Sequence, residues 1–248
     1  MSDVAVPAPE SAERVNSFGR IFGVLFSPQA TFESIARKPT WLVPVAVLTV
    51  LSVILLGLFA HRVGWRAFFE RQMETSARVQ QMSPQQQEQA LEMQVKYAPP
   101  FVYVIGAASS LVSVLVIAAV LMGLFNGLAG TSLRFKTSLA VTAYASSPSI
   151  IKALLGVLVL LFKDPSTVDL QNLVASNAAG FLSHGSAPWL GARLRSVDVF
   201  TFWPLVLMAI GYHSAAPKKL SMGAAFAWLF IVYLVIALAA AGITAAFT

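Results

Sequence analysis

Residues 99–133 read PPFVYVIGAASSLVSVLVIAAVLMGLFNGLAGTSL and contain no Asp, Glu, Lys or Arg. A helix needs about 20 apolar residues to cross the roughly 30 Å hydrocarbon core of a bilayer. Backbone polar groups in lipid must bond within their own segment or in a closed barrel, whose strands alternate in polarity. Because 111–125 is almost continuously apolar, this stretch predicts a transmembrane α-helix, with its membrane part at 101–125.

Four more apolar runs accompany this one along the chain. The chain is 57% hydrophobic and only 11% charged, whereas soluble domains carry about a quarter charged residues. We therefore predict an all-α membrane protein, a bundle of five transmembrane helices preceded by an amphipathic interfacial helix. Residues 1–40 form a cytoplasmic N-terminal segment and 41–248 the membrane domain, with spans at 41–60, 101–125, 137–162, 199–213 and 221–247.

The basic residues set the expected orientation. The net charge is +6, but these residues are dispersed without interleaved aromatics, which favours topogenic charge and lipid contact over nucleic-acid binding. The short loops after the second and fourth runs hold no acid and carry Arg134, Lys136, Lys218 and Lys219. Both loops fall on the side of the N-terminus, so the positive-inside rule places the N-terminus in the cytoplasm.

An amphipathic pattern precedes the first span. One helical face, with spacing i, i+3, i+4, i+7 and i+8, would carry Phe18, Ile21, Phe22, Leu25 and Phe26. Arg14 and Arg20 could then face lipid headgroups. The helix either lies in the membrane interface or packs on its own bundle. A second short helix is expected to begin at Ser27 and Pro28 and to carry Phe32 and Ile35. Further along, residues 66–95 predict a helical hairpin outside the membrane, with Ser83 near its turn.

Lys152 is a charge inside the third apolar run. Charged side chains at this depth are costly and usually face a bundle interior or water. Pro148 frees a backbone carbonyl, which the Ser146 and Ser147 hydroxyls could satisfy. One interpretation is a polar pocket of Lys152, Tyr144, Ser146, Ser147 and Pro148. The alternative is that Pro148 starts a shorter span and Lys152 extends to the interface.

Small and polar residues mark other positions in the apolar runs. Gly106 with Ser110, and Gly123 with Gly127, have the small-xxx-small spacing of close helix packing, within the bundle or between protomers. Ser109, Ser110 and Ser113 either bond to carbonyls of their own helix or line a pore. Asp198 and His213 bracket the fourth run, as interfacial end markers or as an ion or proton site, and lie about 22 Å apart along a helix.

The sequence contains no motif typical of an enzyme active site. The chain has no cysteine, and His61, His184 and His213 follow no metal-ligand spacing. The chain also lacks a phosphate-binding loop, a dinucleotide turn, a zinc-protease helix and a nucleophile elbow. The sequence therefore predicts no catalytic residues, no metal and no cofactor.

Three stretches resemble one family. RIFGVLFSPQATFESIARKPTWLVPV (20–45), FKTSLAVTAYASSPSIIKALLG (135–156) and VDVFTFWPLVLMAIGYH (197–213) resemble bacterial Yip1-domain membrane proteins. The resemblance implies five spans, a cytosolic N-terminus and no catalytic residues. Eukaryotic members are associated with small GTPases of vesicle traffic and carry an Asp-Leu-Tyr-Gly-Pro motif that is missing here. The resemblance thus implies a bacterial inner membrane rather than GTPase binding.

We therefore expect a non-catalytic protein of membrane organisation, or an adaptor or scaffold. Its partners would be membrane lipids, other membrane proteins or further copies of itself, and not nucleic acid. The alternative is a small transporter or channel with a path lined by Lys152, Tyr144 and the serines of the second span.

Overall fold

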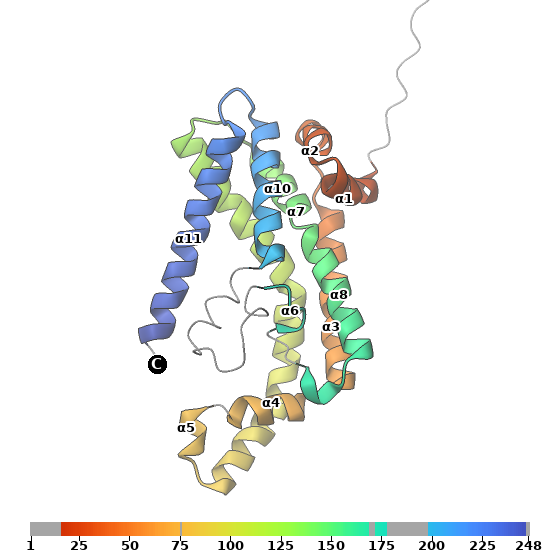
Figure 1. Ribbon diagram of the computed structural model, residues 1–248, viewed down its shortest axis with the longest axis vertical. Helices are drawn as coiled ribbons and strands as arrows, with labels where there is room; N and C mark the ends of the chain where they lie inside the picture. The colour runs from red at the N-terminus through yellow and green to blue at the C-terminus, as the bar shows by residue number, and fades with distance from the viewer. Residues whose placement is uncertain (1–15, 75, 169–171, 178–197, 247–248) are drawn as a thin grey trace, which may run out of the picture.

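The computed structural model describes residues 16–74, 76–168, 172–177 and 198–246, and helices make up nearly all of these ranges (Figure 1). Two short helices, α1 (Ser17–Phe26) and α2 (Pro28–Arg37), come first. The longer elements are α3 (Leu42–Arg62), α6 (Pro84–Leu128), α7 (Phe135–Ala145), α8 (Pro148–Phe162), α10 (Val199–Ala215) and α11 (Met222–Ala246). The connecting elements are α4 (Trp65–Glu74), α5 (Ala77–Gln80) and the 3-10 turn η1 (Pro165–Thr167). The prediction of an all-α membrane protein is confirmed.

Within the part of the chain that the structure describes, four helices are long and apolar enough to cross a membrane. They are α3, α6, the α7–α8 pair taken as Phe135–Phe162, and α11 over Met222–Ala239. The fourth predicted run forms α10, which has 17 residues and is therefore about 26 Å long at 1.5 Å per residue. It packs against α2, α7 and α11. A crossing by α10, and with it the count of five spans, stays a prediction.

The helix that contains the second predicted span, 101–125, extends well beyond it. Helix α6 runs unbroken for 45 residues through Pro99 and Pro100, which makes it about 68 Å long, roughly twice the hydrocarbon thickness. Two prolines remove backbone hydrogen bonds, but strong helix formers such as Gln, Glu, Leu and Met lie before them. Its polar first half must therefore project from the membrane.

That projecting half forms the predicted helical hairpin with α4. Ser83 caps α6: the Gln86 amide donates to the Ser83 hydroxyl at 3.4 Å, and the Ser83 amide donates to Gln86 Oε1 at 3.0 Å. Arg66 on α4 bridges to Glu88 on α6 at 2.6 Å. Phe69, Met73 and Leu91 form a small buried core between the two helices.

The elements sort to two ends of the molecule (Figure 1). Helices α1 and α2, the link from α6 to α7 and the link from α10 to α11 gather at one end, whereas α4 and α5 lie at the other. The first end therefore collects Arg37, Lys38, Arg134, Lys136, Lys218 and Lys219.

A chain of buried hydroxyls ties three helices together near that end. The Tyr212 hydroxyl on α10 lies 2.5 Å from Ser138 Oγ and 3.0 Å from Thr142 Oγ1 on α7. Ser138 Oγ donates to the Ala118 carbonyl on α6 at 2.7 Å. Hydrogen bonds between helices are important in lipid, because the hydrophobic effect does not drive helices together there. These bonds therefore hold α6, α7 and α10 together beneath α1 and α2.

Candidate functional site

Lys152 forms an ion pair with Asp198 inside the bundle. Lys152 lies in the second turn of α8, Asp198 caps the start of α10, and Nζ lies 2.5 Å from Oδ2. The other carboxylate oxygen of Asp198 accepts from Ser176 Oγ at 2.8 Å and from the Phe200 amide at 2.9 Å. The Asp198 side chain is only 7% exposed, and that of Lys152 is 41% exposed. The buried carboxylate therefore accepts from three donors, and one of them, the Lys152 ammonium, belongs to a partly exposed side chain.

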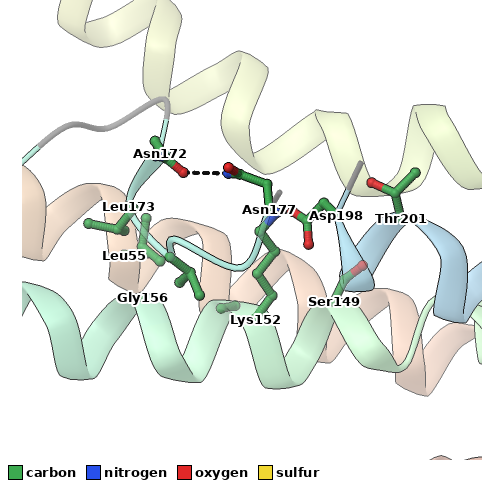
Figure 2. A pocket seen from close by; sticks show the side chains of 11 residues that line it. Leu55, Ser149, Lys152, Gly156, Asn172, Leu173, Asn177, Asp198 and Thr201 are labelled. Atoms are coloured by element: carbon green, nitrogen blue, oxygen red, sulfur yellow. Dashed lines mark hydrogen bonds and ion pairs between the residues drawn. The ribbon is translucent and has the colours of Figure 1, made fainter. Parts of the chain in front are cut away.

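The pair lies in the wall of a cavity of about 420 Å³. Helices α3, α8 and α10 and the irregular segment 172–177 enclose it (Figure 2). Its polar lining comprises Ser149, Lys152, Asn172, Asn177, Asp198 and Thr201. Within membrane proteins, irregular backbone is tolerated only where it is buried in protein or lines a cavity. A Cβ on Gly156 would lie 2.8 Å from Leu55 and 3.0 Å from Leu173, so this glycine lets the segment approach α8.

A second cavity, of about 430 Å³, adjoins the first and shares Ser149, Ala153 and Thr201 with it. Its lining includes Ser52, Ser109, Ser110, Ser113 and Ser146, together with apolar side chains of α3, α6 and α10. None of the described residues that line it is charged. Ser109 Oγ also donates to the Gly106 carbonyl at 2.8 Å. Ser109 therefore bonds to a carbonyl of its own helix and also lines this cavity, whereas a pore lined by these serines stays a prediction.

The structure divides the predicted polar pocket into two places. Tyr144 lies away from Lys152: it is fully buried, donates to the Ser17 carbonyl at 3.2 Å and lies 3.2 Å from Thr40 Oγ1. Ser146 and Ser147 bond to the carbonyls of Thr142 and Tyr144, and Pro148 opens α8. The reason is the helix break itself, because Tyr144 precedes it and faces α1, whereas Lys152 follows it.

Asp198 was predicted as an end marker or ion site, without Lys152 as its partner. The available signal was an acidic residue directly before an apolar run, at a cap position. His213 lies at the opposite end of α10, where its Nδ1 is 2.8 Å from the Leu220 carbonyl. Asp198 and His213 therefore have separate surroundings and share no site.

Helices α1 and α2 form a hairpin that packs on the bundle by one side only. Ile21, Val24, Phe32 and Ile35 are buried in the main core, and Leu25 packs partly against it. Phe18, Phe22 and Phe26 are instead 61%, 63% and 82% exposed. The predicted apolar face thus splits, with Ile21 and Leu25 turned to the bundle and the three phenylalanines, four residues apart, forming an exposed row.

Arg20 lies away from the headgroups that we expected it to face. It is buried, and its guanidinium donates to the carbonyls of Lys38 at 2.8 Å and Ser34 at 3.0 Å. These carbonyls end α2, where the helix dipole favours a cation. Arg20 therefore ties α1 to the end of α2 within the hairpin, while Arg14 lies outside the described residues.

The two small-residue pairs have different surroundings. Gly106 faces Leu56 of α3, which occupies the space that a Cβ would need, and Ser110 lines the second cavity. Gly123 and Gly127 have nothing within 4 Å of an added Cβ among the described residues. Close packing inside the bundle is thus seen at Gly106, whereas the Gly123 pair faces away from it.

Comparison with known proteins gives a family match. Residues 22–243 match the Yip1 domain. The chain is 26% identical, over 197 residues, to membrane protein YknW of Bacillus subtilis, with 78% of this chain and 77% of that protein covered. No solved structure matches the chain. Because the domain covers nearly the whole chain, including the α1–α2 hairpin from Phe22 and both partners of the ion pair, this multi-pass membrane protein belongs to the Yip1 domain family.

Proposed function

We propose that this protein organises membrane, or recruits other membrane proteins, without catalysis, through contacts with lipid and partner helices. The exposed row of Phe18, Phe22 and Phe26 carries this proposal. A helix with aromatic residues on one face and a fixed opposite face can insert shallowly into a leaflet, and such insertion is sensitive to curvature. Here the bundle supplies the fixed face, since Ile21 and Val24 are buried in it.

The surrounding charge supports the same proposal. The end that carries α1 also collects six basic residues, named above, and anionic headgroups attract such residues by about 1 kcal/mol each near the surface. A cytoplasmic N-terminus agrees with the positive-inside rule, and a location in a bacterial inner membrane agrees with the Bacillus relative. Helix α1 would then act on the cytoplasmic leaflet.

Replacing all three phenylalanines with serine is expected to abolish enrichment of the protein in curved membrane. The fluorescently labelled full chain would be reconstituted in giant vesicles from which thin tubes are pulled. The density ratio of tube to vesicle should exceed 1 for the native chain and fall to about 1 for the serine variant, because shallow insertion is lost. A variant with leucine at the same positions keeps the apolar row and should behave as the native chain.

The depth of α1 gives an independent measurement. Because the chain has no cysteine, one cysteine at position 22 or at position 29 can carry a nitroxide. Gln29 lies exposed on α2 and serves as the control. The label at 22 should collide mostly with oxygen and the label at 29 with a water-soluble nickel complex. Equal access of the nickel complex to both labels would refute the membrane-surface role of α1.

The cavity at Lys152 favours a second candidate function, a small transporter or channel. Two adjoining cavities bring hydroxyls from α3, α6, α8 and α10 to one charged pair. Such a path would move small zwitterions such as glycine, so proteoliposomes should release labelled glycine faster than protein-free vesicles. Lys152→Met should return release to the protein-free rate. Release at that rate by the native protein excludes this candidate.

A further inference from the structure

A buried oxygen in the first cavity lacks a donor. Asn177 is only 7% exposed, and its Nδ2 donates to Asn172 Oδ1 at 2.7 Å (Figure 2). Its Oδ1 is buried and has no hydrogen-bond partner among the described residues. Buried acceptors are rarely left unpaired, and each exception needs an explanation, such as a bound molecule. The oxygen is therefore a place for a donor that comes from outside the chain.

Asn177 lines the same cavity as the two residues of the ion pair. Asn177 and Asp198 face each other in an isolated antiparallel bridge, and Asp198 holds the Lys152 ammonium. That ammonium has three donors, of which the carboxylate occupies one. The start of α10 is capped by Asp198 itself, whose other oxygen accepts from the Phe200 amide. One cavity thus presents an unpaired acceptor and a cation with free donors.

The charges of the site limit the chemical class of ligand that it can bind. Lys152 and Asp198 cancel each other, so a ligand of zero net charge leaves the site neutral. The orphan acceptor calls for an N–H or O–H donor, and the free donors of the Lys152 ammonium bond most strongly to an anionic oxygen. We propose that this cavity binds a zwitterion in which a primary ammonium lies close to a phosphate, the chemistry of an ethanolamine phospholipid headgroup or of free phosphoethanolamine. The ammonium donates to Asn177 Oδ1, and the phosphate accepts from Lys152.

The neighbouring cavity favours a lipid as the source of this group. It adjoins the first at Ser149, Ala153 and Thr201, carries no charged side chain among the described residues that line it, and its apolar lining includes Leu48, Val114, Ile117, Leu205 and Met208. A headgroup in the first cavity could extend its glycerol and chain into the second. A cavity of about 420 Å³ also falls within the usual 300–1,000 Å³ of ligand sites. This site is separate from the α1 surface, and its occupancy does not depend on the function proposed for α1.

The test compares three ligands on the intact chain in detergent, by native mass spectrometry. Dioctanoyl phosphatidylethanolamine should bind at least about tenfold more tightly than dioctanoyl phosphatidylcholine, because choline has no N–H to donate and one charge-assisted bond is lost. Free phosphoethanolamine is the third ligand. Weaker binding of the free compound identifies lipid as the source, and equal binding identifies the soluble zwitterion. Equal binding of the two lipids overturns the proposal.

Variants locate the binding. Asn177→Leu keeps the size of the side chain and removes the acceptor, so its affinity for the ethanolamine lipid should fall at least about tenfold, to that of the choline lipid. Gln94→Leu makes the same chemical change at an exposed position of α6 and should bind as the native chain does. The triple serine variant of α1 should also bind normally, which separates this proposal from the preceding one. If Asn177→Leu does not fold, the ratio of the two lipids on the native chain decides.

Discussion

Lys152→Met is expected to lower the stability of the fold by up to about 3 kcal/mol, less than for a fully buried ion pair, because the Lys152 side chain is 41% exposed. The loss arises at Asp198, whose 7% exposed carboxylate would keep its charge and lose its only cation among the described residues. For a chain of this size, such a change corresponds to a melting temperature lower by up to roughly 12 °C. The measurement is thermal unfolding in detergent, followed by size exclusion.

Three further variants test whether the pair is the cause. Asp198→Asn keeps an oxygen for Ser176 and Phe200 and leaves Lys152 partly exposed, so its loss should be smaller. The stability lost in the double variant should be smaller than the sum of the losses in the two single variants, because removing the second charge relieves the first. Lys163→Met removes an exposed cation at the end of α8 and should leave the melting temperature unchanged. A Lys152→Met protein as stable as the Lys163→Met control would show that Lys152 only extends to the interface.

Local patterns predict much of this fold. Long apolar runs identify α3, the second half of α6, α8 and α11, because hydrocarbon accepts only self-bonded backbone. Cap chemistry also predicts local structure: Ser83 closes a capping box and Pro148 opens α8. The continuity of α6 was missed, because a pair of prolines usually ends a helix and only the flanking helix formers oppose them.

Partners distant in sequence could not be predicted in this way. Lys152 and Asp198 are separated by 46 positions, and no periodicity links them. Arg20 has an ordinary amphipathic position, yet it is buried because the carbonyls that end α2 fold back onto it. Similarly, Tyr144 was expected beside Lys152 from sequence proximity, but the break at Ser147 turns the two residues to different neighbours. The candidate site therefore emerges only when α8, α10 and 172–177 are seen together.

Phe32→Ala is expected to release the α1–α2 hairpin from the bundle. Phe32 is fully buried, and its ring lies against Gly211 of α10, where an added Cβ would be 2.9 Å from Phe32 and 2.6 Å from Val141. Truncating a buried phenylalanine costs about 3–5 kcal/mol. At 1.4 kcal/mol per factor of ten, the open hairpin should become at least about a hundredfold more populated. Amide exchange of 28–37 in detergent, followed by mass spectrometry, should accelerate by the same factor.

The hairpin offers its own control, because Phe26 is 82% exposed on the adjoining helix. Phe26→Ala makes the same truncation without opening a cavity, so exchange in 28–37 should stay at the native rate. Gly211→Ala changes the same contact from the side of α10. The added methyl group overpacks it, so docking of the hairpin on the bundle should weaken by about 1–3 kcal/mol. If Phe32→Ala and Phe26→Ala exchange at the same rate, docking on α10 does not hold the hairpin. The exposed phenylalanine row would then lack the rigid support that membrane insertion by α1 requires, and the proposed surface role would fail with it.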